Sequence, residues 1–265
     1  MSKEEYLIND TPLKALTVFA MPMILGSFFQ QVYNMADSII VGQFVGSSAL
    51  AAVGACAALT NVFICVALGA GVGAGVLVSR YFGAREYGKM KTIVSTSLIS
   101  FLVLSILLGV FGFWFSHGMM SGLQTPADIL KEAVLYLRVY FVGFPFLFMY
   151  NILSTMFTAI GESKIPLGLL IFSSILNIGM DLWLVAGLGL GVFGAALATL
   201  IAQGISAVLS FLIFFNRMRR YKSTFSWFDG RELCSMLQIA VPSVLQQSTC
   251  LLYTSPSPRD RTRSR

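Results

Sequence analysis

The chain has 265 residues, of which 56% are hydrophobic and 11% charged, and its mean hydropathy is +0.79. Soluble domains carry about 25% charged residues, so this composition excludes an ordinary soluble protein and predicts an all-α polytopic membrane protein. The net charge of +6 comes from loops and from the C-terminal residues, and it gives no indication of nucleic-acid binding.

Apolar segments long enough to cross roughly 30 Å of hydrocarbon follow one another along the chain. The first two are longer than a bilayer requires, so they are expected to tilt or bend, and Pro22 gives the first a bend point. The polar N-terminus has no basic n-region, so no cleaved signal peptide is expected. The predicted spans are 13–43, 49–79, 92–116, 131–159, 165–187, 192–215 and 234–253.

The lysines and arginines of the loops predict the orientation, because cytoplasmic loops carry an excess of them. The opposite side has only Lys131 and, inside the fourth span, Arg138. We therefore expect a multi-pass protein of the cytoplasmic (inner) membrane with a cytoplasmic N-terminus. The residues assigned to the cytoplasmic side are Lys3, Lys14, Arg80, Arg85, Lys89, Lys91, Lys164, Arg217, Arg219, Arg220, Lys222 and Arg231.

A weak internal repeat predicts two lobes. The pattern A-x-P-x-[IV]-L occurs around Pro22 and again around Pro242, six helices later. Six spans restore the starting direction, so the copies are related by an axis along the membrane normal, as in many transporters. The expected divisions are a cytoplasmic arm 1–12, a six-helix N-lobe 13–216, a basic inter-lobe loop 217–233, the first helix of a truncated second six-helix lobe 234–253, and a non-native tail 254–265.

Two carboxylates lie inside membrane-length apolar segments. Asp37 and Asp181 each stand roughly 9 Å below the outer end of their helix, at 1.5 Å per residue. Intramembrane acids are costly and rare, and they usually mark an ion pathway, a proton relay or a substrate site. Asn177 precedes Asp181 by one turn on the same face, and Thr199 and Tyr136 lie at a similar depth in their own helices. These five residues form the predicted site.

Each of the five also has a structural interpretation. Asn and Thr hydrogen-bond between membrane helices, and Tyr is frequent at the membrane interface. The glycine run Gly69 to Gly75 looks like a dinucleotide-binding loop, but it lies inside an apolar helix with no preceding strand. We therefore interpret it as a surface of close helix packing.

The chain resembles the N-terminal half of a transporter of the multidrug and toxic compound extrusion (MATE) family, prokaryotic branch. The resemblance rests on four segments of the sequence. They are Pro22, Gln31, Asn34 and Asp37 in the first span, Gly161-Glu-Ser-Lys-Ile-Pro166, Asn177-x-x-x-Asp181, and Gly191-Val-Phe-Gly194-Ala-Ala-Leu-Ala-Thr199. It implies twelve helices in two lobes. It also implies an N-lobe cation site at Asp37, Asn177, Asp181 and Thr199, with a tyrosine matching Tyr136.

The resemblance implies a secondary antiporter that exports cationic or amphipathic small molecules in exchange for protons or sodium ions. Such a protein is not an enzyme, needs no cofactor or resident metal besides the coupling ion, and is expected to be monomeric at full length in the lipid bilayer. The chain departs from the family where some members carry a glutamate in the seventh helix, because Gln246 and Gln247 stand there.

Two other interpretations stay open, and two are set aside. The open ones are a lipid-linked oligosaccharide flippase of the same superfamily, which would favour a strongly cationic cavity, and an inactive membrane fragment. An intramembrane aspartyl protease needs sequence contexts that neither acid has, and no HExxH motif supports a metalloprotease. The final residues, from LLYTSPSPRD onward, resemble translated vector or adapter sequence, which motivates the predicted non-native tail.

Overall fold

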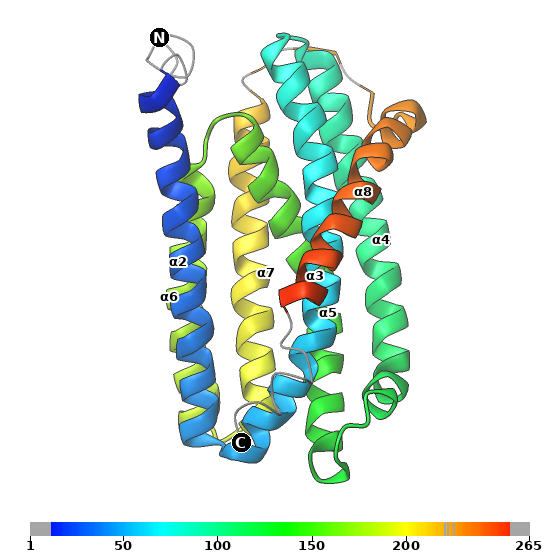
Figure 1. Cartoon of the computed structure of the whole chain (residues 1–265). Coiled ribbons are helices and arrows are strands. Elements are labelled where there is room, and N and C mark those ends of the chain that lie inside the picture. The colour runs from blue at the N-terminus through cyan, green and yellow to red at the C-terminus, as the bar shows by residue number, and fades with distance from the viewer. Residues whose placement is uncertain (1–11, 220, 222, 225, 255–265) are drawn as a thin grey trace.

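The computed structural model describes residues 12–219, 221, 223–224 and 226–254. This part of the chain folds into seven helices, and each coincides with one predicted span (Figure 1). In the fifth span, α6 is continued by a π-helical segment, η1. The elements are α2 Pro12–Phe44, α3 Ser47–Gly83, α4 Tyr87–Gly122, α5 Ala127–Ala159, α6 Lys164–Asp181, η1 Leu182–Gly187, α7 Gly191–Met218 and α8 Gly230–Thr254.

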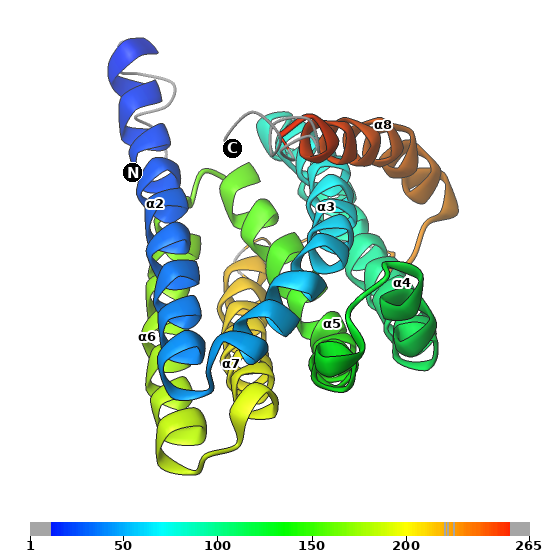
Figure 2. The same cartoon turned by 60° about the horizontal axis from the view of Figure 1, so that its bottom comes forward.

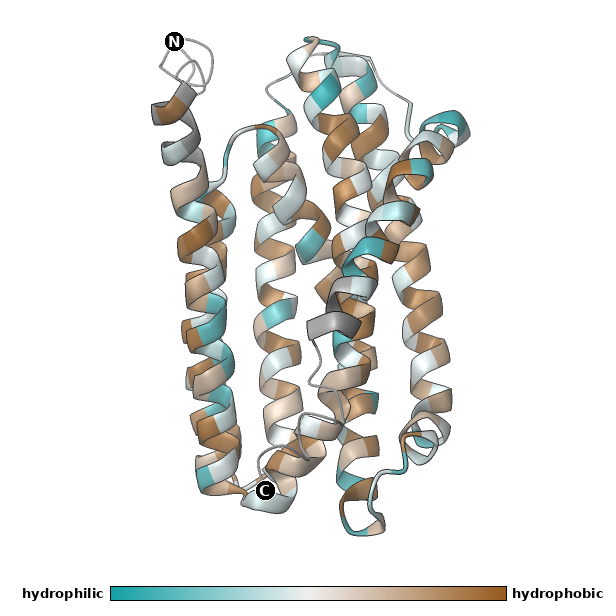
Figure 3. Ribbon diagram, in the orientation of Figure 1, coloured by the Kyte–Doolittle hydropathy of each residue, from teal (hydrophilic) through white to brown (hydrophobic). Residues whose placement is uncertain are grey.

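Length and hydropathy qualify α3, α4, α5, the α6–η1 unit and α7 as membrane spans among the described residues. Figure 3 shows hydrophobic residues dominating α4, whereas hydrophilic residues interrupt the second half of α2. Pro22 lies inside α2, and the helix continues through it. The predicted bend at Pro22 therefore stays a prediction. The predicted arm and tail lie almost wholly outside the described residues.

The helices form two groups that meet at α3, α5 and α7. One group is α2, α6 and α7, with α2 packed chiefly on α6; the other is α3, α4, α5 and α8 (Figures 1 and 2). Helix α5 joins them, because it packs on α3, α4 and α7. Edge-to-face rings fix this centre, with the Phe63 ring 5.0 Å from that of Phe141 and 5.4 Å from that of Phe144.

The glycine run of α3 is a packing surface, as predicted. A Cβ at Gly69 or Gly73 would collide with the backbone of α8, at Val244 and Met236 respectively. A Cβ at Gly75 would collide with Thr155 of α5. Without side chains at these positions, α3 approaches two helices at once, which is what small residues permit in membrane bundles.

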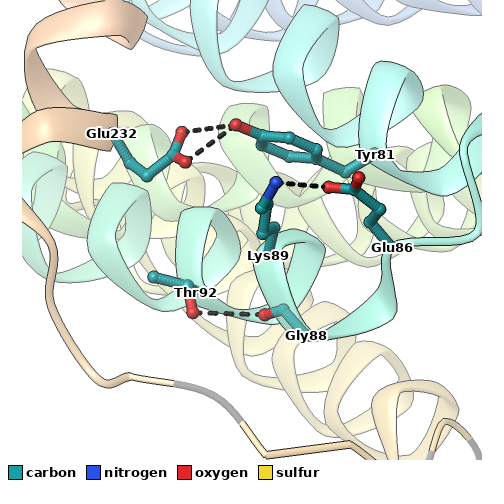
Figure 4. A network of polar contacts seen from close by, with 6 residues as sticks. All are labelled: Tyr81, Glu86, Gly88, Lys89, Thr92 and Glu232. Carbon is teal, nitrogen blue, oxygen red and sulfur yellow. Dashed lines mark hydrogen bonds and ion pairs between the residues drawn. The ribbon is translucent and has the colours of Figure 1, made fainter.

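The segment between α7 and α8 is hydrogen-bonded to α4. The hydroxyl of Thr92 accepts from the backbone N of Ser226 at 3.1 Å, and the hydroxyl of Thr96 accepts from the backbone N of Asp229 at 3.0 Å. At the start of α8, the hydroxyl of Tyr81 donates to the Glu232 carboxylate at 2.7 Å (Figure 4). These contacts hold α8 against the ends of α3 and α4.

Candidate functional site

The side chains of Asp37 and Asp181 meet between α2 and α6. They lie close enough to interact electrostatically, and Asp181 is fully buried. Two ionised carboxylates this close repel each other, and a proton or cation bound between them would relieve the repulsion. The Oδ1 atom of each is buried without a hydrogen-bond partner among the described residues. The structure thus brings together the two acids that the sequence places at one level, and their role in a shared cation site stays a prediction.

Asn177 connects Asp181 to α7. When its amide nitrogen faces Asp181, Nδ2 donates to Asp181 Oδ2 at 2.7 Å, and Oδ1 accepts from the backbone N of Thr199 at 3.2 Å. The Thr199 hydroxyl donates to the carbonyl of Ala195 at 3.1 Å. The i, i+4 spacing of Asn177 and Asp181 therefore places both on the helix face that meets α7.

Two tyrosines complete the cluster. Tyr136 of α5 lies close enough to Asp37 and Tyr33 to interact electrostatically, and its ring packs against the apolar group of Val41 and Val192. Tyr33 lies beside Thr199, and it was not predicted. Its position four residues before Asp37, hence on the same helix face, is the signal that could have found it.

A small polar cavity of about 40 Å³ adjoins the cluster on the side away from η1. A water molecule needs roughly 10–15 Å³ of such space, so the cavity has room for a few. The hydroxyl of Ser206 in its wall is buried without a hydrogen-bond partner among the described residues. The lining residues are Gln30, Tyr33, Tyr150, Leu170, Ser173, Ser174, Asn177, Thr199, Ala202, Gln203 and Ser206.

Asp181 stands where the α-helix gives way to the π-helical segment η1. Such segments are rare and often occur at functional sites, because the wider turn re-aims neighbouring side chains. No group of three or more His, Cys, Asp or Glu side chains converges in the described part of the chain. The site therefore offers two carboxyls and several neutral oxygens, a set suited to a proton or a small monovalent cation.

Comparison with known proteins identifies the family of the chain. The family model described as MatE matches residues 22–183, which is more than half of the chain. The chain belongs to the MatE family. Of the predicted site, Asp37, Tyr136, Asn177 and Asp181 fall within the matched residues of this MatE chain, and Thr199 follows them.

Curated relatives of the MatE chain carry names of multidrug transport. The chain is 28% identical over 243 residues to "Probable multidrug resistance protein YoeA" of Bacillus subtilis, covering 87% of this chain and 52% of that protein. It is 31% identical over 244 residues to "Multidrug export protein MepA" of Staphylococcus haemolyticus, covering 91% and 54%. The chain thus spans about half the length of the curated relatives it matches.

Solved structures agree on the fold. A crystal structure of MATE in complex with MaD5 superposes with a TM-score of 0.86 at 26% identity, over 95% of this chain and 58% of the other. An outward-facing conformation of a multidrug resistance MATE family transporter superposes with a TM-score of 0.78 at 27% identity, over 93% and 55%. The predictions of an all-α membrane protein that is not an enzyme, and of membership in this family, are confirmed.

Proposed function

We propose that residues 13–216 form one lobe of an antiporter that exports cationic or amphipathic compounds in exchange for protons or sodium ions, and that 234–253 opens the second lobe. The observation that carries this proposal is the contact between Asp37 and Asp181 in a membrane-spanning bundle. Such a pair carries a large electrostatic cost when both acids are ionised. A bound proton or sodium ion would remove that cost, so site occupancy would be coupled to the separation of α2 and α6.

Helix α2 is suited to be the moving element. It packs chiefly on α6, and at Gly26 the interface leaves room for a Cβ, which would stand 3.7 Å from Leu170. Its other face exposes Ile24, Phe28 and Met35. Pro22 lies roughly 22 Å along the helix from Asp37, at 1.5 Å per residue. Because Pro22 cannot donate a backbone hydrogen bond, bending the helix there breaks few hydrogen bonds. Such a bend would move Asp37 relative to α6.

The ion gradient supplies the driving force. One charge moving inward is worth about 2.3 kcal/mol per 100 mV of membrane potential. At 1.4 kcal/mol per factor of ten, this corresponds to about a 50-fold concentration ratio of a neutral substrate. The orientation predicted from the loop charges, with a cytoplasmic N-terminus, would place the site in the outer half of the membrane.

Among the described residues, the surroundings of the two acids lack the cations that an anionic lipid-linked sugar would need nearby. None of the eleven residues lining the adjoining cavity is Lys or Arg. A cavity for pyrophosphate-bearing lipids would need cations to balance the ligand charge. The two acids adjoin this neutral lining, and the names of the curated relatives refer to multidrug resistance and export. Both facts support the antiporter over the flippase.

The site itself can be tested on the 265-residue chain, because all its proposed members lie within it. Carboxyl infrared difference spectra of the chain in liposomes are recorded as pH or sodium concentration changes. We expect a carboxyl signal that disappears in Asp37→Asn and also in Asp181→Asn. The double variant should lose no more of the signal than either single variant, because the two acids act as one unit. Glu232→Gln, distant from the pair, is the control. An unchanged signal in both single variants would exclude the proposed site.

Export is tested separately, with the chain continued by its own downstream coding sequence to the length of its relatives. Vesicles carrying this protein should take up or release a fluorescent cation such as ethidium under an imposed pH or sodium gradient. The two gradients, applied one at a time, identify the coupling ion. If the protein is shown to be inserted in the vesicle membrane but transports none of a broad panel of cations, multidrug export is refuted.

A further inference from the structure

A groove on the lipid-facing side of α4 and α5 has no role in the proposed transport cycle. It has a volume of about 310 Å³ and is entirely apolar in its lining side chains. Trp114 is 77% exposed, and Val110 and Val142 are also exposed. The helices touch beside the groove because Gly109 and Gly112 lack side chains, so that Phe141 packs directly on α4. The main lining residues are Val110, Phe113, Trp114, Phe141, Val142 and Pro145.

One cation stands at the outer end of this groove. The Arg138 guanidinium lies over the ring of Phe113, 5.5 Å from its centroid, and its Nε donates to Ser116 Oγ at 3.2 Å. No carboxylate forms an ion pair with Arg138 in the part of the chain that the structure describes. A guanidinium with two neutral contacts keeps donors available for an anion, and its planar geometry suits a phosphate or a carboxylate. At the membrane interface, the phosphate of a lipid headgroup is the anion of this kind.

The depth of Arg138 fits a lipid headgroup. It lies 11 residues into α5, about 16 Å along the axis, whereas a helix of 33 residues is about 50 Å long. If α5 is centred on about 30 Å of hydrocarbon, roughly 10 Å projects at each end, so Arg138 starts about 6 Å inside the boundary. An arginine side chain at that depth extends its head to the interface.

The length of the groove fits an acyl chain. From Trp114 to Ile106 the lining covers about 12 Å of α4, close to the roughly 15 Å of one leaflet's hydrocarbon. We propose that this groove binds an anionic phospholipid of the outer leaflet, with its phosphate on Arg138 and an acyl chain along Val110 and Val142. The positive charge of Arg138 beside the apolar groove favours an anionic lipid over an apolar segment of protein.

The test uses Trp114 as a reporter in the 265-residue chain, with Trp183→Phe and Trp227→Phe removing the other tryptophans. The chain is placed in phosphatidylcholine bilayers that contain a low fraction of either phosphatidylglycerol or phosphatidylcholine with brominated acyl chains, which quench indole fluorescence. We expect brominated phosphatidylglycerol to quench Trp114 at a mole fraction about tenfold lower than brominated phosphatidylcholine. Equal quenching by the two lipids would overturn the proposal.

Variants assign the binding to Arg138 and the groove. Arg138→Gln should raise the phosphatidylglycerol fraction for half-quenching about tenfold, equivalent to about 1.4 kcal/mol, and Arg138→Lys should raise it less. Arg231→Gln, an exposed arginine at the other end of the bundle, is the matched control and should change nothing. Val142→Phe should fill the groove and weaken quenching while the charge remains. A preference for phosphatidylglycerol that survives both Arg138→Gln and Val142→Phe would also overturn the proposal. If Arg138→Gln fails to fold, the lipid comparison in the Arg138 protein and Val142→Phe decide.

Discussion

The substitution Gly73→Ala tests the contact between α3 and α8. A Cβ at this position would stand 2.7 Å from the carbonyl oxygen of Met236 and 2.8 Å from the Cβ of Ala240. Ordinary contacts begin near 3.4 Å, so α8 must move away from α3 by about 0.7 Å. The contacted carbonyl belongs to the helical backbone of α8, so it cannot move without the helix. Overpacking of this kind costs about 1–3 kcal/mol.

Gly54→Ala in the same helix is the matched control, because a Cβ there has no neighbour within 4 Å. Both substitutions gain the same helix propensity, up to about 1 kcal/mol, so the difference between the variants isolates the steric cost. Equilibrium unfolding in SDS, followed by circular dichroism, should show Gly73→Ala less stable than Gly54→Ala by about 1–3 kcal/mol. Equal stabilities would show that α8 does not pack on α3 as described.

Three further outcomes are expected. Asn177→Ala removes the donor to the buried Asp181 carboxyl and should lower the free energy of unfolding by about 1–3 kcal/mol. It should also weaken the infrared response to the coupling ion, and a variant with unchanged stability and an unchanged response would contradict the hydrogen bond. Tyr81→Phe removes a hydrogen bond to the Glu232 carboxylate and should cost about 1 kcal/mol, with no further loss when Glu232→Gln is added in a double-mutant cycle. The 265-residue chain alone, which spans half the length of its relatives, should not lower ethidium accumulation in cells, and efflux equal to that of the continued protein would show that one lobe suffices.

The helices could be predicted because the bilayer imposes a length and a composition on each span. The predicted span 165–187 corresponds to Lys164–Gly187, and 192–215 corresponds to Gly191–Met218. The π-helical character of Leu182–Gly187 could not be predicted, because it depends on whether each backbone N–H bonds to the carbonyl four or five residues earlier. Neither could the binding of the α7–α8 segment to Thr92 and Thr96, since hydropathy does not reveal which polar loop meets which helix.

The acids of the site could be predicted because an ionisable side chain inside a membrane helix carries a large desolvation cost and is usually functional. Depth along the helix placed Asp37 and Asp181 at one level, and the structure brings them into contact. Tyr33 was missed because a tyrosine has no comparable cost in an apolar segment, so its presence attracts no notice. Only its spacing from Asp37, or its contact with Thr199, identifies it.

The attachment of the α7–α8 segment to α4 has a consequence for biogenesis. Chains are synthesised from the N-terminus, and early segments can pack before later ones emerge. Thr92 and Thr96 are synthesised before Ser226 and Asp229, so α4 could already present its two hydroxyls as the later segment emerges. Capture of this segment would fix where α8 starts, and so which of its residues face Gly69 and Gly73, before the ribosome has completed α8.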